Sequence, residues 1–232
     1  MTTLNDLGNG LYERNDHASL LGMHIGHRMT VVVLPAQSGG GLWIHSPVAW
    51  TQELWDELEA LVPEGAPKHL VIPSRTHDLH LKQWMERIPA DTTYAPDALQ
   101  KAHKDWAVGH TLTEEFRASW SNEFEHTLLD GAPRVSEVAF FHKPSKTLVL
   151  VDSVFNLSGE GTFLGKLFLK LDRCYKGIAM SLMFRMMTKD KAAMGKSLER
   201  VLAWDFERVV LGHGKTIVGA DLAEVRELLA NP

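Results

Sequence analysis

Residues 204–214 read WDFERVVLGHG, and this stretch does most to indicate the fold. Its apolar, β-branched part, Phe206 to Leu211, predicts a short strand, and Gly212-His213-Gly214 follows directly. Glycines on both sides of a histidine allow close approach to the backbone. We therefore expect His213 to stand at the exposed end of a sheet and to point into a cleft.

A second apolar strand, upstream of the first, also ends in a polar residue. Residues 147–152 read TLVLVD and predict a buried central strand that ends at Asp152. An unpaired buried carboxylate is costly, so Asp152 must be hydrogen-bonded, ion-paired or metal-bound. The strand before it, 135–142, joins it through the turn KPSK, which places His142 near Thr147 and, we expect, at the surface.

A third candidate ligand segment lies within residues 69–80, HLVIPSRTHDLH, which predict a short strand followed by a loop. The helix expected from Leu81 puts His77, His80 and Trp84 at three- and four-residue spacing on one face. Three strand ends would thus each supply a residue that binds zinc, iron or manganese. Their convergence is the central prediction for the site.

The remaining elements suit two sheets packed face to face with helices outside. We expect one domain over residues 1–232, of class α+β, with a helical insertion at about 160–200. The segment 97–135 is the least regular. The other expected elements are a hairpin over 28–45 around Gly39 to Gly41, a helix from Thr51 to Pro63, a strand near 92–94, helices over 163–187 and 191–202, and a terminal helix over 221–229.

The insertion is unusually rich in Leu and Met. Its apolar stripe can be a core-covering face or an adaptable surface for a partner or lid, and we favour the core because amphipathic helices normally bury such a stripe. The stripe consists of Leu164, Leu167, Leu169, Leu171, Met180, Leu182, Met183, Met186 and Met187.

The order of these ligand segments resembles the metallo-β-lactamase superfamily, in which a strand leads to HxHxDH, a later strand ends in a bridging Asp, and a final strand ends in Gly-His. The resemblance spans roughly residues 28–218 and implies a four-layer αββα sandwich. Aligning 75–80 on the motif matches His77 and His80, whereas Arg75 replaces the first His and Leu79 the Asp. A two-metal hydrolase is therefore disfavoured.

Two further comparisons with that superfamily concern individual histidines. Its additional His between the motif and the bridging Asp has no clear counterpart, because 130–135 contains none, and His110 or His126 could substitute only by an unusual route. The segments 42–47 and 204–213 look like an uncharacterised branch with no established substrate, in which 74–79 tends to read Asn-Lys-x-His-His-Leu. On that alignment His77 is retained and His80 is incidental.

The composition of the chain argues against nucleic acids and membranes as binding partners. The chain of 232 residues has 24 Lys and Arg, 29 Asp and Glu and a net charge of −5, without a basic stripe, so nucleic acid is not an expected partner. Cys174 is the only cysteine, which excludes an intrachain disulfide. We see no signal peptide and no apolar run near the ~20 residues of a membrane span, so we expect a soluble, cytoplasmic protein without a membrane partner.

Two functions remain in view. The first is a hydrolase-like enzyme with one zinc, iron or manganese ion held by residues from the set His77, His80, Asp152 and His213. The second is a metal-free binding or scaffold protein whose cleft takes an anionic small molecule through Arg75 and histidines. Arg75 and His45 are the candidate substrate-binding residues. A redox protein on the same fold is a third, less favoured function. The sequence does not determine the oligomeric state, and it is compatible with a homodimer.

Overall fold

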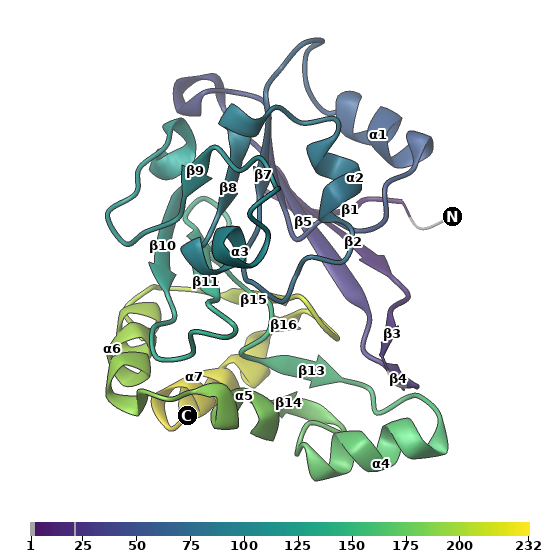
Figure 1. Ribbon diagram of the computed structural model, residues 1–232, viewed down its shortest axis with the longest axis vertical. Coiled ribbons are helices and arrows are strands. Elements are labelled where there is room, and N and C mark those ends of the chain that lie inside the picture. Colours follow the sequence, from purple (N-terminus) through teal and green to yellow (C-terminus); the bar gives the residue numbers. More distant parts are fainter. Residues whose placement is uncertain (1–2, 21) are drawn as a thin grey trace.

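The computed structural model describes residues 3–20 and 22–232, and two β-sheets form its centre (Figure 1). The seven-stranded sheet has the order β1 (Asn5–Gly8), β2 (Leu11–Asp16), β5 (His27–Val33), β6 (Leu42–His45), β7 (Lys68–Val71), β8 (Thr93–Ala95) and β9 (His110–Thr111). The five-stranded sheet has the order β10 (Phe124–Leu128), β11 (Val138–His142), β12 (Thr147–Leu150), β15 (Arg208–Leu211) and β16 (Ile217–Val218). Two small hairpins stand apart, β3 (Ser19–Leu20) with β4 (Met23–His24), and β13 (Phe155–Leu157) with β14 (Gly177–Ala179).

The helices flank the two sheets. The α-helices are α1 (Gln52–Glu59), α2 (Leu81–Met85), α3 (Asp97–Ala102), α4 (Phe163–Leu171), α5 (Leu182–Met187), α6 (Lys191–Leu202) and α7 (Leu222–Ala230). Short 3-10 turns cover Ala36–Ser38, Ala90–Thr92, Ser119–Asn122 and Gly219–Asp221. Figure 1 shows α1 and α2 on one side of the sheets and α6 and α7 on the other.

Strand alternation sorts the apolar side chains into layers, because successive residues point to opposite faces of a sheet. Trp43 of β6 meets Phe140 of β11 between the sheets, with ring centroids 5.2 Å apart. Its neighbour Ile44 packs in a second cluster with α1, α2 and α3. Leu150 of β12 packs in a third cluster with α6 and α7. These layers form the expected four-layer αββα sandwich, which confirms the predicted fold class.

Several local predictions are confirmed. Strands β5 and β6 pair antiparallel, and β7 is followed by α2 from Leu81. The Thr51 hydroxyl caps α1 by accepting a hydrogen bond from the amide of Leu54 at 3.2 Å. Gly41 has φ +80°, and a Cβ there would collide with the carbonyl of Pro67, so only glycine fits this approach.

Two predictions about histidines are wrong. His77 and His80 both precede α2 and lie in a loop, so they do not share a helix face with Trp84. His142 does pair with Thr147, but it is buried instead of at the surface. Alternation explains its burial, because residues 138, 140 and 142 face the same side of β11, toward the other sheet.

The preference for a core role of the Leu- and Met-rich stripe is also wrong for most of it. Leu169 and Met180 are buried, but Leu164, Leu167, Leu171, Met183 and Met186 are exposed. Segment 155–187 forms the β13–β14 hairpin with α4 and α5, at the lower edge of Figure 1. Within the described residues, no helix has the length and apolar character needed to cross a bilayer.

Candidate metal centre

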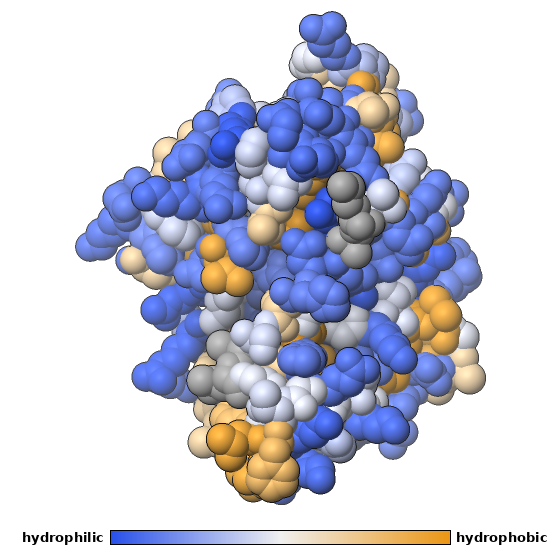
Figure 2. All heavy atoms as spheres, turned by 90° about the vertical axis from the view of Figure 1, so that its right-hand side faces the viewer, coloured by the Kyte–Doolittle hydropathy of each residue, from blue (hydrophilic) through white to orange (hydrophobic). Residues whose placement is uncertain are grey.

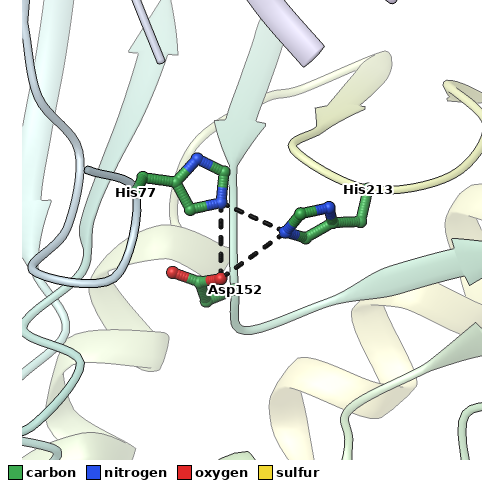
Figure 3. Close-up of side chains that lie close together, drawn as sticks. All are labelled: His77, Asp152 and His213. Atoms are coloured by element: carbon green, nitrogen blue, oxygen red, sulfur yellow. Dashed lines mark hydrogen bonds and ion pairs between the residues drawn. The ribbon is translucent and has the colours of Figure 1, made fainter. Parts of the chain in front are cut away.

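Three strand ends meet at one edge of the sandwich. Strands β12 and β15 are parallel neighbours, with Leu150 opposite Leu211, so the residues that follow them leave the sheet side by side. Asp152 follows β12 and His213 follows β15. His77 comes from the loop after β7 of the other sheet. Figure 3 shows the three side chains pointing toward one another, as their predicted convergence requires.

The distances within this cluster suit metal coordination. The Nε2 atoms of His77 and His213 are 3.2 Å apart. Asp152 Oδ1 lies 3.3 Å from Nε2 of His77 and 3.7 Å from Nε2 of His213. Ligands about 2.0–2.1 Å from a tetrahedral zinc ion are roughly 3.3–3.4 Å from one another. The three donor atoms therefore already have the spacing of three corners of such a site.

Hydrogen bonds behind the rings orient both histidines. His213 Nδ1 lies 2.7 Å from the carbonyl oxygen of Gly26, which can only accept, so Nδ1 carries the proton. In neutral His213 the lone pair is then on Nε2 and faces the cluster. His77 Nδ1 lies 2.7 Å from the Ser46 hydroxyl, and Ser46 has φ +52°. Such contacts from the outer nitrogen are typical of metal-binding histidines.

Two hydroxyls fix the carboxylate in the same way. Ser74 Oγ and Thr76 Oγ1 donate to Asp152 Oδ2 at 2.8 and 2.6 Å, which leaves Oδ1 for the cluster. Burial by itself would raise the pKa of Asp152, but the charges and hydrogen bonds of His77 and His213 hold the pKa well below its usual range. The carboxylate is therefore anionic at neutral pH.

Residues 9–167 match the family described as a domain of unknown function, DUF4336. The chain belongs to the DUF4336 family. No curated protein matches its sequence.

Solved structures similar to this DUF4336 chain identify the fold. The DIM-1 metallo-β-lactamase is 15% identical, with a TM-score of 0.63 over 98% of this chain and 96% of that chain. A metallo-β-lactamase from Pontibacter korlensis is 14% identical, with a TM-score of 0.62 over 100% of both chains. The metal-soaked Flv1 flavodiiron core from Synechocystis sp. PCC6803 is 10% identical, with a TM-score of 0.62 over 98% of this chain and 60% of that chain. The predicted metallo-β-lactamase fold is confirmed.

The other predicted site residues lie around or away from the cluster. His80 is half-buried, and its ring centroid is 5.7 Å from that of His27, outside the three-residue cluster. His45 is buried and stacks on Trp43 with ring centroids 4.9 Å apart, so its ring lies in the core and takes no part in the cluster. Arg75 is exposed, and among the described residues it forms no ion pair. The nearby carboxylate of Asp78 pairs with His103.

Sequence reasoning missed His27, which stacks on His77 with ring centroids 5.0 Å apart. Burial, reinforced by the nearby histidines 77, 213 and 80, lowers the pKa of His27 to about 3. Its Nε2 lies 3.2 Å from the carbonyl oxygen of Pro47 and donates to it. His27 therefore adds a neutral ring beside the cluster. Its position at the start of β5, far from the recognised motif, carries no signal of this role.

Glu137 was also missed. It is completely buried and accepts hydrogen bonds from the amides of Val151 and Asp152 at 2.7 and 3.2 Å and from the Ser153 hydroxyl at 3.1 Å. Burial, followed by the charge of Asp152, raises the pKa of Glu137 to about 8. Glu137 thus holds the turn that presents Asp152. A carboxylate inside the apolar run VSEVAFF was the signal that could have found it.

Proposed function

We propose that this protein is a hydrolase that uses a single metal ion bound by His77, Asp152 and His213. The observation that supports the proposal most is the convergence of three donor atoms within 4.8 Å, each belonging to a side chain whose outer polar atom is already engaged. Preorganised ligands of this kind bind a metal without paying for reorientation of the side chains.

The donor set favours zinc, iron or manganese. Two imidazoles and one carboxylate are found at catalytic zinc sites, which keep a further position open, and at ferrous sites. When bound, such an ion lowers the pKa of a water molecule toward 7 and polarises a carbonyl or phosphoryl group. One ion is proposed because His77, Asp152 and His213 are the only group of three or more potential ligands found among the described residues.

The chain's own residues would support this chemistry in separate ways. The hydrogen bond to Gly26 keeps the lone pair of His213 on Nε2. The hydroxyls of Ser74 and Thr76 fix the orientation of Asp152, and His77 and His213 keep its carboxylate anionic. Neutral His27 borders the cluster without adding positive charge that would oppose a cation. A small-molecule substrate would bind at the cluster, in keeping with a metallo-β-lactamase fold.

Metal analysis tests the proposal directly. Protein purified without added metal and then dialysed against zinc, iron or manganese should retain about one equivalent of one of them. His77→Gln and His213→Gln should abolish retention. His126→Gln is the matched control, because His126 lies on β10 and its Nε2 donates to the Thr113 carbonyl. Retention under roughly 0.2 equivalents by the native protein would overturn the proposal.

One observation favours a second candidate, a metal-free protein that binds an anionic small molecule. Arg75 is exposed and, within the described part of the chain, has no carboxylate partner, so its guanidinium is free to bind an anion. Thermal-shift measurements with a panel of phosphorylated and carboxylated metabolites test this candidate, with Arg75→Ala as the control. Tight metal binding together with no shift from any metabolite would eliminate it.

A further inference from the structure

Helix α4 presents apolar side chains to solvent. Its five exposed apolar residues are between 39% and 82% exposed, which is unusual for side chains of this size. Together with two methionines of α5 they form what we call the α4 patch, Phe163, Leu164, Leu167, Phe168, Leu171, Met183 and Met186. Figure 2 shows apolar side chains gathered at the lower end of the molecule, where α4 lies in Figure 1.

The helix is held firmly with this face outward. At about 100° per residue its five exposed apolar residues span an arc of roughly 140°. The opposite side carries buried Leu169 and Gly165, where a Cβ would collide with the backbone of Gly22. The Thr162 hydroxyl caps the helix by accepting from the Gly165 amide at 3.1 Å. The arc therefore faces solvent because the other side of α4 already packs on the protein.

Helix α5 extends the same surface. Asp172, just after α4, accepts hydrogen bonds from the amides of Leu182 and Met183, through its carbonyl at 2.8 Å and its carboxylate at 2.6 Å. These contacts tie the start of α5 to the end of α4. Met183 lies at this junction and Met186 is in the same short helix, and both are exposed.

The segment that carries the α4 patch is rich in basic residues. Residues 163–189 contain six basic residues and one acidic residue, whereas the rest of the chain contains 18 basic and 28 acidic residues. The basic residues are Lys166, Lys170, Arg173, Lys176, Arg185 and Lys189. Among the described residues none of these six forms an ion pair, in contrast to Lys68 and Lys146 elsewhere. The patch thus combines exposed apolar area with uncompensated cations.

This combination matches the surface of an anionic bilayer. Peripheral helices insert apolar side chains at the boundary between headgroups and acyl chains, while flanking Lys and Arg attract anionic headgroups. A symmetric pair of chains is a poorer match, because an isologous interface would bring the two basic segments together. Charge complementarity therefore selects a lipid surface over a second copy.

We propose that the α4 patch docks this protein onto anionic lipid bilayers, with the apolar arc of α4 inserted at the interface and the lysines and arginines on the headgroups. Docking differs from crossing the bilayer, and it revises the expectation that this chain has no membrane partner. That expectation rested on the lack of a spanning segment. The proposal is independent of metal binding and hydrolysis at the cluster.

Vesicle flotation tests the proposal. Native protein is mixed with vesicles of phosphatidylcholine alone or of phosphatidylcholine with phosphatidylglycerol, at about 0.1 M and about 1 M salt. We expect flotation with the anionic vesicles at low salt and at least about tenfold weaker binding to neutral vesicles. Phe163→Ser with Leu167→Ser, and Lys166→Glu with Lys170→Glu, should each weaken anionic binding about tenfold or more.

Matched controls use exposed residues away from the α4 patch. Val218→Ser and Lys104→Glu should leave flotation unchanged. No binding of the native protein to anionic vesicles, or equal binding by both double variants, would overturn the proposal. So would a native dimer in sedimentation that Phe163→Ser with Leu167→Ser dissociates while vesicles stay unbound, because the patch would then join two copies.

Discussion

The metal cluster buries polar side chains, and the α4 patch exposes apolar ones, so both depart from the usual distribution of residues in a folded protein. They differ in whether the chain itself supplies contacts for these side chains. In the cluster, polar groups are drawn inward, and Ser46, Ser74 and Gly26 engage their outer atoms. In the α4 patch, apolar side chains face outward, and within the described part of the chain the nearby cations form no ion pair with a carboxylate. Burial of unpartnered polar groups is costly, whereas exposed apolar area is tolerated and stays available for association. The polar groups of the cluster therefore find hydrogen-bond partners within the chain, whereas the apolar side chains of the patch remain exposed to solvent.

The largest expected effect is on the cluster. Asp152→Asn keeps the shape of the side chain but removes its charge, so affinity for zinc should fall by more than about 100-fold, beyond the 10–100-fold typical of an outer partner. Titration calorimetry with zinc measures the change. Asp105→Asn, at an exposed position, is the control and should bind as the native protein does. Equal affinity in Asp152→Asn would show that the carboxylate is not a ligand.

A second prediction separates the two faces of α4. Leu169→Ala, on the buried face, should lower the free energy of unfolding by about 2–4 kcal/mol, because it removes packed methyl groups. Leu167→Ala, on the exposed face, should change the free energy of unfolding by less than about 0.5 kcal/mol. Urea denaturation measures both. Similar losses in the two variants would mean that the apolar arc is packed and not free.

A third prediction extends the comparison to a buried histidine outside the cluster. Burial lowers the pKa of His142 from 6.5 to about 4, so the unfolded chain binds its proton first as pH falls. The contribution of neutral, buried His142 to the free energy of unfolding is therefore fully present above pH 6.5. It is lost progressively as the pH falls from 6.5 to about 4. Relative to pH 8, the loss from His142 at pH 5 should be roughly 2 kcal/mol.

The measurement for His142 is the free energy of unfolding in urea at a series of pH values. His142→Gln should show a shallower decline between pH 6.5 and 4 than the native protein, because one buried titrating group is absent. His126→Gln, whose ring is only partly buried, should follow the native curve. A native curve without any decline over this range would contradict burial of the neutral ring.

The smallest expected effect concerns a hydrogen bond behind the cluster. Ser46→Ala removes the hydroxyl 2.7 Å from His77 Nδ1 and should weaken zinc affinity about tenfold. Ser145→Ala is a close control, because its hydroxyl also lies 2.7 Å from a histidine Nδ1, that of His142, outside the cluster. Calorimetry should show no change in zinc affinity for Ser145→Ala. Equal effects in the two variants would indicate general loosening of the fold.

Much of the architecture could be predicted from local patterns. The apolar, β-branched runs in 147–152 and 206–211 indicated two strands, and the polar residue after each strand marked Asp152 and His213 as candidates. The structure does bring both residues to one edge together with His77. A strand and the polar residue that follows it can be predicted in this way because both depend only on residues that are adjacent in the sequence.

Only the tertiary structure decided which residues become neighbours across the fold. The HxHxDH alignment matched both His77 and His80, and the path of the loop before α2 put only His77 in the cluster. His27 comes from the distant strand β5 and Glu137 from the residue before β11, and no metal-binding motif marks either. Periodicity in α4 likewise shows which residues share a face, but what covers that face depends on the rest of the chain. The sequence therefore predicted a core position for the leucines of this face, and only the structure shows that Leu164, Leu167 and Leu171 are exposed.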